Sequence, residues 1–203
     1  MAITIDQIKE LRELTGAGVL DCRKALEQND GDVEKAVESL REKGLAKAAK
    51  RADREVKEGM LELYSHGNGR VGVIVEVNSE TDFVARSAPF RLLAHEVALQ
   101  IAAGNPRYIK PEDIPTDVME QERQKSRKLA KEQGKPDSVI ERIVEGRLEK
   151  FLNEVCLLRQ PYVRDEDLTI EKLLSQNIVS IGENIVIRRF VRWEVGEDEA
   201  SSS

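Results

Sequence analysis

Residues 70–86 read RVGVIVEVNSETDFVAR and decide the fold, because a strand signal here is followed at once by a helix signal. The first half is apolar and β-branched between turn residues, which is typical of a buried strand. The polar triplet Asn78-Ser79-Glu80 ends that strand. Ser79 and Asp82 then have the S-x-x-D spacing that is typical of a helix N-terminus. The pattern predicts a stiff strand that runs into one short helical turn.

That turn carries Thr81, Asp82, Phe83 and Val84, and we call these four residues the knuckle. A second helix is expected directly after it, because Ser87-Ala88-Pro89 places proline near a first helical position. Two interpretations of the knuckle are open. The pattern alone favours a Phe83 ring folded back into the core and an Asp82 that caps a helix. In the alternative, both side chains project from a rigid support and push into another protein surface.

The N-terminal segment, residues 1–44, predicts a three-helix bundle. Thr4 and Gln7 have the spacing of a capping box. The three helices show apolar residues at helical intervals, and glycine-containing turns separate them. Lys43-Gly44 is expected to close the bundle. A bundle of about 40 residues is marginal on its own, so we expect it to lean on the segment that follows.

Residues 45–55, LAKAAKRADRE, predict a basic helical linker with few large apolar side chains. Lys47, Lys50, Arg51 and Arg54 would share its basic face. Such a face is favoured as a solvated surface. The alternative is contact with phosphate, which would make RNA a partner and give binding a steep salt dependence.

Residues 56–196 predict an α+β core, in which helices pack on a small antiparallel sheet. A hairpin is indicated by the turn sequence His66-Gly67-Asn68-Gly69. The tail, residues 197–203, is acidic and small and is expected to be disordered. The remaining elements expected in the core are a helix over 90–101, an antiparallel pair of helices over 116–133 and 136–158, an extended break over 160–163, a short helix over 168–174, and a third strand over 185–195.

Composition sets limits on the class of protein. The chain has 203 residues, of which 34% are charged and 40% hydrophobic, as in soluble globular proteins. No apolar run approaches the roughly 18–20 residues that a membrane span needs, and the N-terminus lacks the pattern of a signal peptide. Cys22 and Cys156 are the only cysteines, which favours a reducing, cytoplasmic location over a disulfide framework. The net charge of −6 disfavours nucleic acid as the main partner.

Motifs for catalysis or metal binding are missing from the sequence. Gly134-Lys135 resembles the end of a phosphate-binding loop, but Leu129 stands where the first glycine belongs. His95-Glu96 resembles the start of a zinc motif, but Leu99 stands where the second histidine belongs. No G-x-S-x-G occurs. We therefore expect neither an enzyme nor a cofactor or metal site.

Four segments, read together, resemble one family, the bacterial and organellar translation elongation factors Ts. The resemblance covers nearly the whole chain, and the segments lie in the order found in the family. Among these proteins the chain looks like a short bacterial-type form, without the duplicated core half of long members. The segments are LRELTGAGVLDCRKAL (11–26) with Gly31-Asp32 behind it, VNSETDFVAR (77–86), EVCLLRQPYV (154–163) and GENIVIRRFVRWEVGE (182–197).

The resemblance implies a guanine nucleotide exchange factor for elongation factor Tu, the GTPase that carries aminoacyl-tRNA. The bundle is similar to ubiquitin-associated domains and would dock on the GTPase domain. Thr81, Asp82, Phe83 and Val84 would enter near the nucleotide site, where the Phe83 ring would wedge between partner side chains. Magnesium coordination would be disturbed, and GDP would leave. No residue of this chain would be catalytic.

Secondary partner contacts are implied for Arg12, Arg23 and Arg51, which occupy basic positions of the family pattern. Some short members of the family dimerise, so the resemblance implies a non-covalent homodimer, which we expect to form through the last strand. A competing interpretation is a binding or adaptor module without exchange activity, since the bundle alone fits that class.

The sequence also departs from the family pattern at three positions outside the knuckle. Ser87 stands where asparagine is usual, Arg159 where an acid is common, and Tyr162 where phenylalanine is common. These departures affect the expected fit to the partner more than the expected activity.

Overall fold

The computed structural model describes residues 3–51 and 53–197, and the side chains of Leu45, Lys47, Ala48 and Ala49 fall outside that description. The expected place of Lys47 on a basic face and the expected disorder of residues 198–203 therefore lie outside the described residues. The chain forms two compact units. Unit 1 contains Met1–Glu62, Val75–Glu96 and Lys172–Arg188, and unit 2 contains Leu63–Ile74, Val97–Glu171 and Arg189–Ser203.

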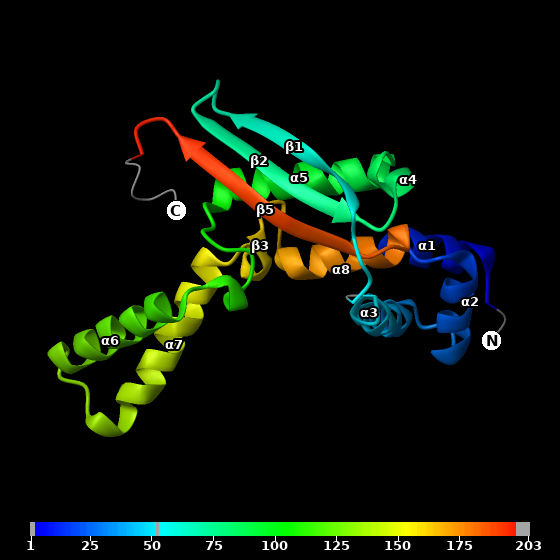
Figure 1. The fold of residues 1–203 in the computed structure, drawn as a ribbon. Helices are drawn as coiled ribbons and strands as arrows, with labels where there is room; N and C mark the ends of the chain where they lie inside the picture. Colours follow the sequence, from blue (N-terminus) through cyan, green and yellow to red (C-terminus); the bar gives the residue numbers. More distant parts are fainter. Residues whose placement is uncertain (1–2, 52, 198–203) are drawn as a thin grey trace. The chain divides into compact units, whose positions relative to one another are not determined.

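The N-terminal part of unit 1 is the expected three-helix bundle (Figure 1). The predicted capping box is confirmed, since the Thr4 hydroxyl accepts from the Gln7 backbone and the Gln7 side chain accepts from the Thr4 N–H. Its helices are α1 (Ile5–Thr15), α2 (Val19–Gln28) and α3 (Val33–Ala49). The buried side chains that they enclose are Leu11, Cys22, Ala25, Leu26, Ala36 and Leu40.

Helix α3 does not end at Gly44, contrary to the sequence-based expectation, but continues to Ala49. Gly44 is buried, and a Cβ atom added there would lie 3.1 Å from a methyl group of Val179. Gly44 therefore permits close approach to α8 (Ile170–Ile181) and does not terminate the helix. The proposed domain boundaries at residues 44 and 55 stay predictions.

A three-stranded antiparallel sheet has the strand order β1-β2-β5. Its strands are β1 (Glu58–His66), β2 (Val71–Ser79) and β5 (Ile185–Glu194), close to the expected ranges. The predicted hairpin turn is confirmed, with Gly67, Asn68 and Gly69 all at positive φ. In unit 1, β2 leads into α4 (Asp82–Ala85) and then into the first half of α5 (Ala88–Gly104). His95 of α5 bonds to Glu62 of β1 at 2.9 Å, which ties this helix to the sheet.

In unit 2, helices α6 (Thr116–Glu132) and α7 (Asp137–Val155) lie side by side as the expected pair (Figure 1). They bury Ala130, Ile140, Val144 and Leu148. A further antiparallel pair of short strands was missed, β3 (Pro161–Tyr162) and β4 (Asp165–Thr169). Two short 3₁₀ turns complete the described elements, Pro111–Asp113 and Leu157–Arg159.

The short helix expected around Ile170, Leu173 and Leu174 is confirmed as α8, which runs to Ile181, whereas Leu168 lies before it in β4. Before the helix, residues 165–169 pair with β3, and the Ile170 N–H donates to the Gln160 carbonyl. Within the described residues, we find no helix that is both long and apolar enough to cross a membrane.

Candidate partner-binding knuckle

The knuckle is held by buried groups on both sides, and Phe83 projects between them. Val75 and Val77 of β2 are fully buried, so the strand is a rigid support. In α4, Val84 and Ala85 are only 7% and 8% exposed. Phe83 is 82% exposed. The interpretation favoured by the pattern alone, a Phe83 ring in the core, is therefore wrong, because Val84 and Ala85 occupy the inward face of this single turn.

Thr81 is the N-cap of α4, and the expected cap at Ser79 is wrong. Thr81 has extended dihedral angles, and its hydroxyl accepts from the Val84 N–H at 3.4 Å. Ser79 is the last residue of β2, where it is fully buried and its hydroxyl donates to the Thr81 carbonyl at 3.0 Å. The Ser79 hydroxyl thus supports the bend that precedes the helix.

Asp82 is the first residue of α4 and does not provide the cap. Its carboxylate pairs with Arg86 one turn later at 2.8 Å, and both side chains are exposed. An exposed pair at this spacing contributes a few tenths of a kcal/mol, about 0.3–0.5. The carboxylate therefore remains accessible next to Phe83.

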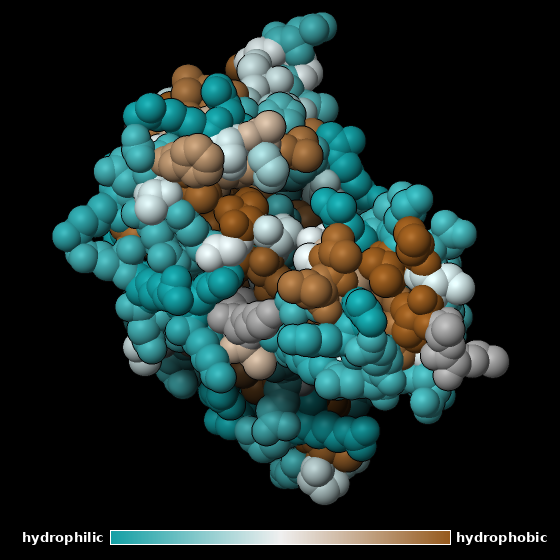
Figure 2. Space-filling view, turned by 90° about the vertical axis from the view of Figure 1, so that its right-hand side faces the viewer, coloured by the Kyte–Doolittle hydropathy of each residue, from teal (hydrophilic) through white to brown (hydrophobic). Residues whose placement is uncertain are grey.

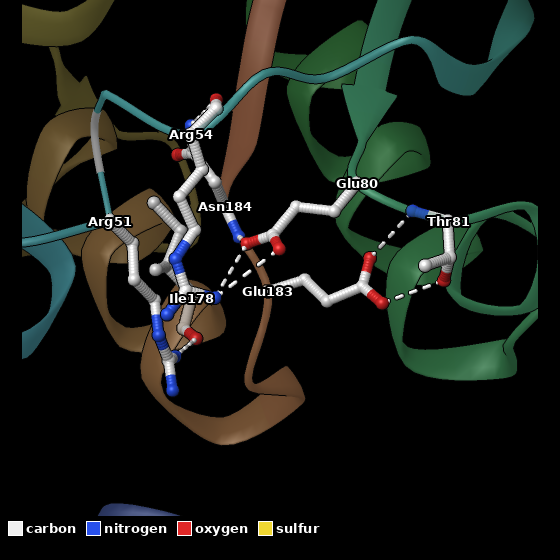
Figure 3. Close-up of polar contacts among 7 residues, drawn as sticks. All are labelled: Arg51, Arg54, Glu80, Thr81, Ile178, Glu183 and Asn184. Carbon is white, nitrogen blue, oxygen red and sulfur yellow. Dashed lines mark hydrogen bonds and ion pairs between the residues drawn. The ribbon is translucent and has the colours of Figure 1, made fainter.

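Two carboxylates from distant parts of unit 1 hold the backbone where the knuckle begins (Figure 3). Glu183 accepts from the Thr81 N–H at 3.0 Å and from the Thr81 hydroxyl at 2.6 Å. Glu80 accepts from the Asn184 N–H at 2.6 Å. Arg54 also pairs with Glu80, at 3.2 Å, which joins the end of the linker to the same cluster.

The pH dependence of stability reports on the Glu80 contact. The Asn184 N–H holds the pKa of the Glu80 carboxyl below its ordinary value of 4.5, and Arg54 adds to this effect while partial burial opposes it. A carboxyl with a lowered folded-state pKa binds fewer protons folded than unfolded, so its stabilisation is present above the unfolded pKa and is lost as the pH falls through the folded one. We expect Glu80→Gln to lose less unfolding free energy than wild type between about pH 6 and pH 3.

Denaturant titrations at a series of pH values measure this difference. Glu166→Gln, at an exposed position of β4, is the matched control and is expected to follow wild type. Equal acid sensitivity of wild type and Glu80→Gln would contradict the prediction.

The three arginines that the family pattern marks occupy different settings. Arg12 lies exposed on α1, and Arg23 is exposed on α2, where it pairs with Glu27 at 2.8 Å. Arg51 donates to the Ile178 carbonyl at 2.9 Å and lies in the cluster of Figure 3. The structure thus brings Arg51 toward the support of the knuckle, whereas Arg12 and Arg23 belong to the bundle surface.

Exposed apolar side chains accompany the knuckle on unit 1. Figure 2 looks onto the side where α1, α2 and α4 lie in Figure 1, and it shows brown, hydrophobic groups open to solvent among teal ones. Exposed apolar surface of this kind marks protein contact sites. The large hydrophobic residues of these three helices that are exposed are Ile5, Leu14, Val19, Leu20 and Phe83.

The described residues contain no cluster of three or more histidine, cysteine, aspartate or glutamate side chains that could hold a metal ion. His95 and Glu96, the residues of the incomplete zinc motif, lie in α5, and His95 bonds to Glu62.

By its fold, the chain is an α+β protein that carries an N-terminal three-helix bundle. The family model described as Elongation factor TS matches residues 4–197. The chain is similar to elongation factor Ts of Carboxydothermus hydrogenoformans, with 56% identity over 96% of this chain and 90% of the relative. It is 56% identical to that of Caldanaerobacter subterraneus subsp. tengcongensis, over 96% of this chain and 98% of the relative. The chain belongs to the elongation factor Ts family, as the four sequence segments indicated.

Proposed function

We propose that this protein is a guanine nucleotide exchange factor that acts on elongation factor Tu during translation elongation. It binds the GDP-bound partner, promotes GDP release and so lets GTP bind. Membership of the family supports the partner and the activity. The observation that carries the mechanism is the 82% exposure of Phe83 on a turn held by buried residues. No bond of a substrate is made or broken by residues of this chain.

The knuckle acts as a wedge at the partner's nucleotide site. The turn that Thr81 caps and Val84 anchors presents Asp82 and Phe83 near the bound magnesium. The Phe83 ring displaces a ligand-bearing segment there. Magnesium demands near-ideal octahedral geometry at about 2.0–2.1 Å, so a small displacement is enough to weaken it. The Asp82 carboxylate lies on the same turn, where it contacts the partner or repels phosphate. The displacement by Phe83 and the charge of Asp82 together lower the affinity of the partner for GDP.

Exchange of this kind needs differential binding. If the partner binds its nucleotide with nanomolar affinity, the binding free energy is roughly 12 kcal/mol, which a single inserted side chain cannot cancel. The protein must therefore bind the nucleotide-free partner more tightly than the GDP-bound one. By linkage, GDP weakens the binding of this protein by the same factor by which this protein weakens GDP.

The N-terminal bundle supplies docking on the partner's GTPase domain. Its exposed apolar residues give it contact area, and Arg12, Arg23 and Arg51 are secondary contacts in this proposal. Direct binding of nucleic acid and of membranes is not part of the function. In this proposal the protein acts in the cytoplasm.

Stimulated release of labelled GDP from elongation factor Tu tests the function, with magnesium fixed and the concentration of this protein varied. The expected result is an acceleration that saturates with concentration. The competing adaptor interpretation predicts complex formation with unchanged GDP release. Binding without acceleration would therefore overturn the proposed exchange activity and favour the adaptor.

We also propose that the protein forms a homodimer through the sheet edge that contains the last strand. This edge strand exposes the apolar side chains of Val191 and Trp193, and Val195 directly after β5 is exposed as well. We expect light scattering to give twice the monomer mass, and Trp193→Ser to lower it toward the monomer, because the largest exposed side chain of the set is lost. A wild-type monomer at high micromolar concentration would exclude the dimer.

A further inference from the structure

The support of the knuckle has a reciprocal pattern. Two dipeptides, Glu80-Thr81 and Glu183-Asn184, lie opposite each other, and each offers a carboxylate to the backbone N–H of the second residue of the other (Figure 3). We call these four residues the clasp. The separation in sequence is 102 residues for the Glu183–Thr81 contact and 104 for the Glu80–Asn184 contact. The clasp therefore joins the end of β2 to the start of β5 within unit 1.

Glu183 completes a helix cap that the local sequence leaves incomplete. In a capping box, an acid or amide at the third helical position accepts from the N–H of the N-cap residue. The third position of α4 is Val84, which has no acceptor in its side chain. Glu183 takes this place from a distant loop, with one oxygen on the Thr81 N–H and the other on the Thr81 hydroxyl.

The direction of Phe83 depends on this cap. Helix α4 has only four residues, and an isolated helical turn is unstable in water because nucleation fixes several dihedral angles for one hydrogen bond. The Phe83 ring is 82% exposed, so core packing does not orient it. Val84 and Ala85 restrain the turn from below, and the clasp restrains its beginning.

The clasp is itself anchored. Asn184 is 2% exposed, and its Nδ2 donates to the Arg54 carbonyl at 3.0 Å. The Arg54 guanidinium in turn donates a hydrogen bond to the Glu80 carboxylate. Hydrogen bonds to charged groups contribute more to stability than neutral ones. The Glu183 contact thus belongs to an anchored network.

We propose that Glu183 is a positioning residue for Phe83: its carboxylate fixes Thr81 and thereby the direction in which the ring projects toward the partner. This inference rests on the proposed exchange function. Glu183 acts through Thr81, and the ring makes the contact with the partner.

A double-mutant cycle on GDP release tests the proposal. Glu183→Ala is expected to lower kcat for stimulated release about tenfold with KM near wild type, because docking by the bundle is kept. In a Phe83→Ala background the same change is expected to have little further effect, because the ring that it positions is gone. A wild-type rate for Glu183→Ala within roughly threefold, or an equal loss in both backgrounds, overturns the proposal.

Matched variants separate positioning from general damage. Glu166→Ala removes an exposed carboxylate from β4 and is expected to keep wild-type kinetics. Thr81→Ser retains the hydroxyl and is expected to keep most of the exchange activity. Thr81→Val retains the shape but loses the hydroxyl contacts with Glu183 and with the Val84 N–H, and it is expected to slow GDP release. Equal activity of the Ser and Val variants counts against the clasp.

A measurement without the partner distinguishes failure of this inference from failure of the proposed function. In the free protein, Glu183→Ala is expected to accelerate hydrogen exchange of the Thr81 amide. This acceleration is expected to be about tenfold larger than the one that the same change causes at buried β2 amides. If the wild-type protein does not accelerate GDP release, the proposed function fails and the positioning role falls with it. The Thr81 amide then still shows whether the clasp forms, and an unchanged amide overturns the clasp itself.

Discussion

Phe83→Ala is expected to slow stimulated GDP release roughly thirtyfold or more while thermal melting stays close to wild type. An aromatic hot spot in a protein interface contributes about 2 kcal/mol or more, which corresponds to such a factor. The folded protein loses little, because the ring is 82% exposed and buries almost no surface within this chain. The measurement is paired: a melting curve for each variant, and GDP release at equal magnesium.

Phe90→Ala is the control for this experiment. Phe90 lies seven positions further along the chain on α5 and is 0% exposed. Its truncation leaves a cavity and is expected to cost about 3–5 kcal/mol of stability. The two phenylalanines thus separate the role of the wedge from that of the core. A Phe83→Ala protein that melts far below wild type, or that exchanges at the wild-type rate, would contradict the wedge.

The strand and the bundle could be predicted because local patterns decide them. The run over residues 71–77 is mostly apolar and β-branched, and Val73, Val75 and Val77 are buried in β2 as that run predicts. The capping box at Thr4 is a local device whose two partners are three residues apart. Such elements depend on neighbours in the sequence, which single-sequence reasoning can see.

The exposure of Phe83 could not be predicted from the pattern, because a large apolar side chain next to a buried strand is most often part of the core. Glu183 gave no signal either, since its partner Thr81 is 102 residues away. Gly44 looked like a helix end, yet its lack of a side chain serves contact with Val179. In each case a distant part of the fold decides the role of the residue.

Strands β3 and β4 were missed for a related reason. Asp165, Glu166 and Asp167 are polar and give no strand signal. Gln160, directly before β3, has a buried side chain that donates to the carbonyls of Gly104 and Glu154, and its own carbonyl accepts from the Ile170 N–H directly after β4. These contacts join residues distant in the sequence, so local patterns carry no cue for the pair.

Removal of the N-terminal bundle is expected to weaken binding to elongation factor Tu at least tenfold while the core remains folded. The bundle has its own hydrophobic core, so its loss leaves the buried residues of β2 and α5 in place. A tenfold loss of affinity corresponds to about 1.4 kcal/mol, a modest demand on a docking module. Affinity by calorimetry and folding by circular dichroism are the two measurements.

The position of the cut makes this experiment specific. A chain that lacks residues 1–54 also loses Arg54, whose carbonyl and guanidinium contact Asn184 and Glu80. A chain that begins at Asp53 keeps those contacts and, like the first chain, lacks Arg51. If the bundle only docks, both truncated chains bind equally weakly, but at saturating concentration the one that begins at Asp53 releases GDP faster, because its knuckle is still held. Wild-type affinity in either chain would exclude docking by the bundle, and equal maximal release rates would show that Arg54 does not support the knuckle.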